Sequence, residues 1–222
     1  MFGSPGSYEI STAGHCGGVG TVVTMIGAVS DKTISGVPTP VLLDIGTISH
    51  STGDGGIGRD WALVRVHPEQ QHLVTPTMAF WGGPIGQFTA TGELVDVSEG
   101  KNIRPGVDPN PFLAQTILHY GHGVGVGAGG TPRVGTSIAW QPTLFIWSGA
   151  ITPGDSGSGS NTLLGDTIGA HREAAGINTH IYVDPFLENG IGILAGTRVT
   201  QVNGTMANGQ LLPYPAPVPG AP

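Results

Sequence analysis

Three short sequences in the chain carry residue types that together perform acyl transfer. His15 lies in Ser-Thr-Ala-Gly-His-Cys, Asp60 opens the apolar sequence Asp-Trp-Ala-Leu-Val, and Ser156 lies in Gly-Asp-Ser-Gly-Ser-Gly. A serine hydroxyl is a weak nucleophile, so a neutral imidazole must take its proton during attack on a carbonyl carbon. A buried carboxylate holds that imidazole in the required tautomer, and glycines beside the serine let backbone N–H groups point at the developing oxyanion.

Asp54 is an alternative to Asp60 for the role of the acid. It lies in the glycine-rich sequence Asp-Gly-Gly-Ile-Gly, which is typical of an exposed turn. Asp60 instead directly precedes an apolar strand that would bury its carboxylate. We therefore expect Asp60 to orient His15.

The elements that must position these residues are short β-strands. Runs of Val, Ile, Thr and Leu recur along the chain, and Asp-Gly and Asn-Gly dipeptides mark turns between them. The segments that we predict as strands are residues 20–29, 40–48, 61–66, 72–80, 88–97, 115–121, 135–140, 143–147, 166–170, 175–183 and 197–202. A short helical turn is expected within residues 184–199, and no long helix is expected anywhere. Many short strands separated by turns predict an all-β sandwich or barrel.

Two changes in composition divide the chain. Residues 97–111 are rich in turn formers and poor in core residues, and alternating prolines after residue 206 cannot enter the centre of a sheet. The predicted units are residues 1–104, which carry His15 and Asp60, residues 105–205, which carry Ser156, and a disordered tail at residues 206–222.

Composition argues against several classes of function. The formal net charge is −7 and no cluster of Lys or Arg is present to neutralise phosphates, so we expect no nucleic-acid partner. No apolar run approaches the roughly 20 residues that cross a membrane, and the first residues lack the features of a signal peptide. The single cysteine, Cys16, is expected to be a small buried hydrophobe.

The three sequences resemble the Thr-Ala-x-His-Cys, Asp-x-Ala-Leu and Gly-Asp-Ser-Gly motifs of the chymotrypsin/trypsin-like serine proteases. The sequence Thr-Ala-Gly-His-Cys is most similar to the bacterial, α-lytic-protease-like branch. The chain order His, Asp, Ser also matches this family and differs from the orders in subtilisins and in α/β-hydrolases.

The resemblance implies two antiparallel six-stranded Greek-key β-barrels with the site between them. It implies that His15 is the general base and acid, that Asp60 orients it, and that Ser156 is the nucleophile. The backbone N–H groups of Gly154 and Ser156 would then form the oxyanion hole.

The resemblance places three further residues beside the substrate. Ala150 falls where trypsin-like members keep an acid, so cleavage after Lys or Arg is not expected. Thr179 falls where the family keeps a Ser or Thr beside the buried aspartate, and its strand would pair with the backbone of a substrate peptide. His180 would line the specificity pocket and favour an acidic or polar side chain.

In the bacterial branch an internal arginine balances the acid that precedes the nucleophile, which here is Asp155. The corresponding region of this chain offers His122, and Arg133 follows a little further on. We favour Arg133, because the charge of a guanidinium does not depend on pH.

The start of the chain departs from the family pattern. The residues before His15 hold one predicted strand, residues 8–11, where the first barrel needs roughly two more strands of ordinary length. The missing portion would normally carry the partner of Cys16. Either the native protein begins earlier with a signal peptide, or this member has an open first barrel with unpaired strand edges.

Other patterns are explained by ordinary structure. Residues 125–130 match Gly-x-Gly-x-x-Gly, but Thr-Pro follows instead of a helix, so a surface loop is predicted. His119 lies near His122, and His171 and His180 lie on neighbouring predicted strands, yet no Cys or acidic cluster completes a tetrahedral metal site. We therefore expect neither a metal nor another cofactor.

The resemblance implies a monomeric serine endopeptidase that acts on peptide or protein substrates and whose native precursor is secreted or held at the cell surface. A non-catalytic relative with a binding or structural role is one alternative, favoured by the missing strands. An unrelated β-sandwich module with a chance Gly-Asp-Ser-Gly is another. The presence of all three reactive residues favours the enzyme.

Overall fold

The structure, a computed structural model of the chain, consists mostly of β-strands. It describes residues 1–4, 6–34, 37–56, 58–75, 77–78, 80–81, 86–88, 94–96, 102–104, 115–123, 130–140, 143–151, 154–163, 172–183 and 191–198. Helical structure in these residues is limited to the 3-10 helices η1 (Gly14–Cys16) and η2 (Pro68–Leu73). No helix in this part of the chain is long and apolar enough to cross a membrane. The prediction of an all-β fold is confirmed.

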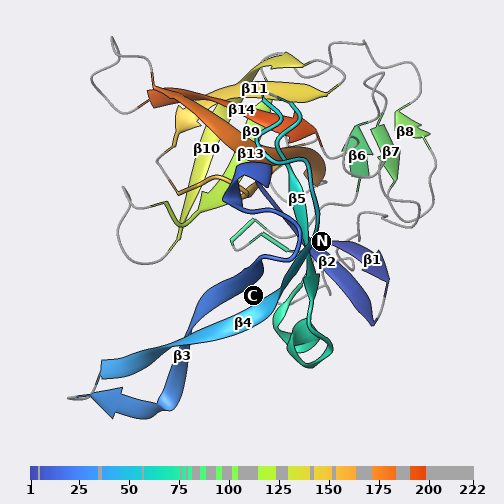
Figure 1. Cartoon of the computed structure of the whole chain (residues 1–222). Coiled ribbons are helices and arrows are strands. Elements are labelled where there is room, and N and C mark those ends of the chain that lie inside the picture. Colours follow the sequence, from blue (N-terminus) through green and yellow to red (C-terminus); the bar gives the residue numbers. More distant parts are fainter. Residues whose placement is uncertain are drawn as a thin grey trace.

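The first sheet has five strands in the order β1-β2-β5-β4-β3, each antiparallel to its neighbours (Figure 1). The central strand β5 is apolar in sequence, and four of its five side chains are buried. Ile48, Ala62 and Val64 form a core against which Ile10 and Val23 pack. The bounds of the strands are β1 (Phe2–Ser4), β2 (Ser7–Thr12), β3 (Val22–Ile34), β4 (Val37–Ser51) and β5 (Ala62–Val66).

The register of β2 and β5 brings two of the predicted site residues to one place. Thr12, the last residue of β2, pairs with Ala62, the first residue of β5. His15 follows β2 in η1, and Asp60 lies just before β5. The two segments therefore meet at one end of the sheet. At its other side, β3 and β4 project from the body as a long two-stranded ribbon (Figure 1).

The second sheet has nine strands in the order β12-β9-β10-β11-β14-β13-β6-β7-β8 (Figure 1). A further antiparallel pairing of β12 with β13 closes the first six of these strands into a ring. Strand β6 continues the sheet from β13, to which it is parallel. The bounds are β6 (Gly86–Phe88), β7 (Leu94–Asp96), β8 (Asn102–Arg104), β9 (Thr116–Gly121), β10 (Thr131–Trp140), β11 (Leu144–Ala150), β12 (Gly159–Leu163), β13 (Arg172–Val183) and β14 (Ile191–Arg198).

Strands β6 to β8 come from residues that the sequence assigns to the first unit, although they hydrogen-bond within the second sheet. The sheet therefore runs across the predicted limit at residue 104. The limits of the units themselves stay a prediction, and the tail at residues 206–222 lies outside the described residues.

The core of the second sheet is built around Trp147, which is fully buried together with Ile117 and Leu118. Its indole lies against the backbones of Gly135 and Gly149. A Cβ added to Gly135 would lie 2.5 Å from Cζ3 of Trp147, and one added to Gly149 would lie 3.0 Å from Cε3. Glycine is therefore required at Gly135 on the neighbouring strand β10 and at Gly149 on β11 itself for the indole to fit inside the ring.

Most predicted strand segments overlap an observed strand. The predicted strands at residues 20–29, 40–48, 61–66, 115–121, 135–140, 143–147 and 175–183 are confirmed in this sense.

The strand predicted at residues 72–80 is wrong, because η2 includes Leu73 and the described residues that follow form no extended strand. Pro68 favours the helical turn at the start of η2. Of the segment in which a helical turn is predicted, residues 184–199, the described part is the strand β14, whose backbone pairs with β11 and β13, and residues 184–190 and 199 lie outside the described part. Residues 166–170 lie outside the described part.

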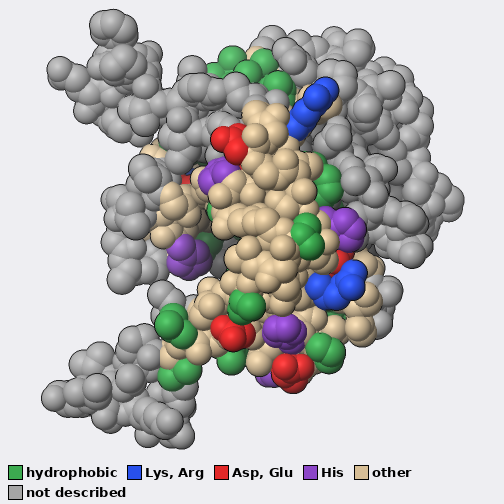
Figure 2. All heavy atoms as spheres, in the orientation of Figure 1, with side chains coloured by type: hydrophobic (Ala, Val, Ile, Leu, Met, Phe, Trp, Pro, Cys, Tyr) green, Lys and Arg blue, Asp and Glu red, His purple; other side chains and the backbone are tan. Residues whose placement is uncertain are grey.

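On the face shown in Figure 2, the Lys and Arg side chains of the described residues are separated from one another. Acidic and His side chains lie between and beside them (Figure 2). This face therefore carries no gathered positive patch among the residues that the structure describes.

Candidate active site

Asp60 holds both the ring and the backbone of His15. Its Oδ2 lies 2.6 Å from His15 Nδ1, and its Oδ1 accepts a hydrogen bond of 2.8 Å from the backbone N–H of His15. The carboxylate is fully buried, whereas the His15 side chain is 36% exposed. Gly14 allows this close approach, because a Cβ there would overlap the carbonyl oxygen of Gly53 and lie 2.9 Å from Asp60 Oδ1.

This geometry sets the protonation of the His15 ring. A carboxylate accepts hydrogen bonds, so the proton that faces Asp60 lies on Nδ1. In a neutral ring Nε2 then carries the lone pair, which is the tautomer required of a general base. Asp54 instead accepts a hydrogen bond of 3.3 Å from Gly56 within its own exposed turn. The structure thus pairs Asp60 with His15, as predicted.

The turn that carries Ser156 lies against the segment that leads into His15. Gly154 and Gly157 on either side of it have positive φ angles of 99° and 91°, which glycine adopts without strain. A Cβ on Gly157 would lie 2.5 Å from Thr12 Oγ1 and 3.0 Å from the backbone nitrogen of Ala13. The turn that carries Ser156, called the Ser156 turn below, therefore lies at the end of β2, where η1 begins.

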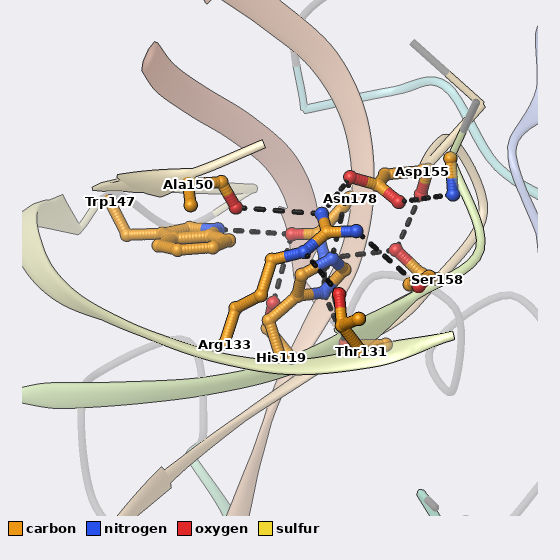
Figure 3. Close-up of polar contacts among 12 residues, drawn as sticks. His119, Thr131, Arg133, Trp147, Ala150, Asp155, Ser158 and Asn178 are labelled. Atoms are coloured by element: carbon orange, nitrogen blue, oxygen red, sulfur yellow. Dashed lines mark hydrogen bonds and ion pairs between the residues drawn. The ribbon is translucent and has the colours of Figure 1, made fainter. Parts of the chain in front are cut away.

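Asp155, the residue before Ser156, is a buried anion with a buried cation beside it. Its Oδ2 forms an ion pair with Arg133 Nη1, and its Oδ1 accepts a hydrogen bond of 2.9 Å from the backbone of Gly123 (Figure 3). The Arg133 side chain is only 5% exposed. His122 is exposed and packs against Tyr120, with ring centroids 5.4 Å apart. The prediction of Arg133 as the partner of Asp155 is confirmed.

The Ser156 turn is also hydrogen-bonded to β13. Gly157 donates a backbone hydrogen bond of 2.7 Å to the carbonyl of Asn178, and Asn178 donates one of 2.8 Å to the carbonyl of Ser158. Ser158 in turn donates a backbone hydrogen bond of 3.0 Å to the carbonyl of Asp155. The turn is thus held by hydrogen bonds to β13 and by the hydrogen bond from Ser158 to Asp155 within the turn itself.

The residues predicted to meet a substrate lie around this turn. Ala150 is exposed at the end of β11, and its carbonyl is 3.5 Å from Arg133 Nη1. Thr179 lies in β13 at a register shift between Asn178 and His180, which is typical of a β-bulge. The side chains of Thr179 and His180 lie outside the described residues.

Sequence reasoning missed Asn178, which lies at the centre of the buried contacts behind the turn. No local pattern predicts it, because its partners come from three other strands. His119 attracts notice in the sequence only as one of a close histidine pair, and the structure separates that pair: His119 is buried and His122 is exposed. The described residues include no group of three His, Cys, Asp or Glu that could hold a metal ion.

The expectation for Cys16 is wrong, because its side chain is exposed and its thiol is free. It lies at the end of η1, where the chain turns toward solvent rather than into the core of the first sheet.

No model of a known protein family matches this chain, and no curated protein matches it. The family resemblance therefore depends on the three motifs and on their geometry.

We predict that Arg133→Met destabilises the fold by about 3–5 kcal/mol, because it leaves the Asp155 carboxylate buried without its cation. Urea unfolding would measure this loss. Adding Asp155→Asn to the variant removes the unpaired charge and should recover part of the stability. Equal losses in the single and double variants would contradict the ion pair as the source of the effect.

We predict that Gly121→Ala destabilises the fold by about 1–3 kcal/mol through crowding. A Cβ at this position would overlap Asp155 Oδ1 and lie 2.7 Å from His119 Nε2. Gly18→Ala is the matched control, since nothing lies within 4 Å of its added Cβ and neither glycine has a positive φ. Thermal unfolding should separate the two variants, and similar midpoints would show that the space beside Asp155 is not constrained.

Proposed function

We propose that the chain is a serine endopeptidase of the two-barrel trypsin-like fold, in which His15, Asp60 and Ser156 form the catalytic triad. The observation that carries the proposal is the contact of the buried Asp60 carboxylate with Nδ1 of a partly exposed His15. That contact gives a histidine base of the required tautomer on the segment against which the Ser156 turn packs. The order of the three residues in the chain supports the same family.

The proposed reaction proceeds through an acyl-enzyme. Ser156 Oγ attacks the carbonyl carbon of the scissile peptide bond while His15 Nε2 takes the hydroxyl proton. The backbone N–H groups of Gly154 and Ser156 stabilise the oxyanion that forms. His15 then gives its proton to the leaving amine as the C–N bond breaks. A water molecule, deprotonated by His15, attacks the ester and releases the acid and Ser156.

The buried Asp60 stabilises the protonated His15 in each half of this cycle. Its two oxygens accept hydrogen bonds from the ring and from the backbone of the same residue, so the ring cannot rotate without losing a buried contact. The energetic benefit is largest when the ring is charged, which is the state near each transition state.

A peptide substrate would bind along β13 as an additional strand. The pairing of β12 with β13 reaches Gly159 and Ile177, and the contacts with the Ser156 turn end at Asn178. The next residue, Thr179, lies at the register shift of β13 against β14, directly after the residue that pairs with the Ser156 turn. Backbone hydrogen bonds to this strand would give affinity that does not depend on the substrate sequence. The native precursor would be secreted or held at the cell surface.

We predict that a fluorophosphonate probe labels the wild-type chain and that Ser156→Ala abolishes labelling, because the probe forms its P–O bond with the serine oxygen as fluoride leaves. Asp60→Asn should slow labelling by about 10³–10⁴-fold, since the ring of His15 loses its orienting anion. Gel fluorescence after timed exposure measures both rates.

Ser7→Ala is the control for this experiment, because Ser7 is an exposed serine of β2. It should label at the wild-type rate. A folded wild-type sample that takes no probe would contradict the proposed function and favour a non-catalytic relative with a binding role.

We predict that peptides with Lys or Arg at the cleaved position are poor substrates, because Ala150 offers no negative charge. Acidic or polar residues should be preferred through His180. Cleavage of a peptide panel that varies this position gives kcat/KM for each residue, and His180→Ala should level the differences. A preference for small apolar residues would contradict the role of His180.

A further inference from the structure

A buried polar cluster lies behind the Ser156 turn, and the proposed reaction does not use it. It contains the side chains of His119 on β9, Trp147 on β11, Ser160 on β12 and Asn178 on β13, next to the carboxylate of Asp155 (Figure 3). His119, Trp147 and Asn178 are all 0% exposed. Because buried polar atoms are costly without partners, the hydrogen bonds in this cluster fix its protons.

The indole of Trp147 determines how the amide of Asn178 is oriented. Trp147 Nε1 can only donate, and it lies 3.1 Å from Asn178 Oδ1. Ser160 Oγ donates to the same oxygen at 2.9 Å. The opposite orientation would turn the amide N–H groups toward the indole N–H. The oxygen of Asn178 therefore faces Trp147, and its nitrogen faces the interior near β9.

The orientation of Asn178 then determines the tautomer of His119. Asn178 Nδ2 lies 3.1 Å from His119 Nδ1, so the amide donates and the ring nitrogen accepts. The carbonyl of Gly159 is farther from Nδ1, at 3.4 Å. If Nδ1 carried the proton, the N–H groups of Asn178 Nδ2 and of His119 Nδ1 would face each other across the shorter contact of 3.1 Å. The shorter contact therefore favours the tautomer with the ring proton on Nε2, although Asn178 Nδ2 also lies 3.3 Å from Ser158 Oγ.

The Nε2–H of His119 points toward the carboxylate of Asp155. Nε2 lies 3.7 Å from Asp155 Oδ2, which is longer than a hydrogen bond but close for an N–H dipole and a buried charge. Among the described residues this buried nitrogen has no hydrogen-bond partner. The charged groups that this ring meets are Asp155 and, across that carboxylate, Arg133.

We propose that His119 is a positioning residue, held by Trp147 through Asn178 as the neutral ring with its proton on Nε2, which fixes the Asp155 carboxylate beneath the Ser156 turn. Asp155 lies between the two residues whose N–H groups would form the oxyanion hole. A displacement of its side chain therefore tilts both donors at once. The kinetic consequences of this inference rest on the proposed function, whereas the tautomer and the position of the turn do not.

The ring itself supplies the first test. In 15N NMR of wild-type chain carrying labelled histidine, His119 should show a proton on Nε2 and an unprotonated Nδ1 at neutral pH. Trp147→Phe removes the donor that orients Asn178, so the ring should then populate both tautomers. A wild-type ring that is charged, or that carries its proton on Nδ1, overturns the proposal.

Two substitutions of His119 separate its two contacts. His119→Gln places an amide N–H where the ring Nε2 was and loses the acceptor for Asn178. His119→Asn keeps an oxygen near the position of Nδ1 and loses the N–H that faces Asp155. A thermal unfolding scan checks that both variants fold, and the backbone amide signals of Gly154 and Ser156 report on the turn.

We predict that His119→Asn shifts these two amide signals and lowers kcat about tenfold or more, with KM changed less than about threefold, because a small misplacement of catalytic donors is costly. His119→Gln should leave the signals in place and keep kcat within about threefold of wild type. If both variants instead lowered kcat and changed KM to a similar degree, in proportion to their loss of stability, His119 would have only a structural role.

The amide signals also keep this inference separate from the proposed function. If the wild-type chain takes no fluorophosphonate, the protease proposal fails, and the NMR results alone decide the positioning role. A shift in His119→Asn that is absent in His119→Gln supports that role, and unchanged signals in both variants overturn it.

Discussion

The ion pair of Asp155 with Arg133 is the constraint on which the Ser156 turn depends. Both side chains are almost entirely buried, so each charge is tolerable only beside the other. Arg133 comes from β10 in the wall of the ring, whereas Asp155 lies within the turn. The backbone of Gly123 adds a second donor to the same carboxylate. The residue before Ser156 is therefore fixed to the interior of the second sheet, and Ser156 is presented on the outer side of the turn.

His15 follows β2 of the first sheet, and Ser156 lies in the turn before β12 of the second, so their relative position depends on how the two sheets pack. Two close contacts between the sheets involve glycines. Gly157 lies against Thr12, and Gly58 lies near Leu144, whose Cβ would be 3.0 Å from a Cβ added to that glycine. Larger residues at these points would separate the sheets and the residues that they carry. The relative position of His15 and Ser156 is thus a property of packing between the sheets rather than of either sheet alone.

The sequence predicted what depends on short segments and missed what depends on distant pairing. Asp60 was predictable as the partner of His15 because it directly precedes an apolar strand. Arg133 was predictable as the partner of Asp155 because its charge does not depend on pH. The strand predicted at residues 72–80 failed, because apolar content alone does not distinguish a strand from a 3-10 turn that starts at Pro68. The membership of β6 to β8 in the second sheet and the role of Asn178 arise from contacts between residues far apart in the chain.

The two buried carboxylates of the site follow one physical pattern. Asp60 binds the ring and the backbone N–H of His15, and Asp155 binds the guanidinium of Arg133 and the backbone N–H of Gly123. A carboxylate that accepts hydrogen bonds from both a side chain and a backbone N–H fixes a segment of the chain as well as the rotamer of one side chain. Since each buried charge needs its donors, movement of either segment exposes or unpairs that charge. The positions of the His15 and Ser156 segments are thereby coupled to the stability of the fold.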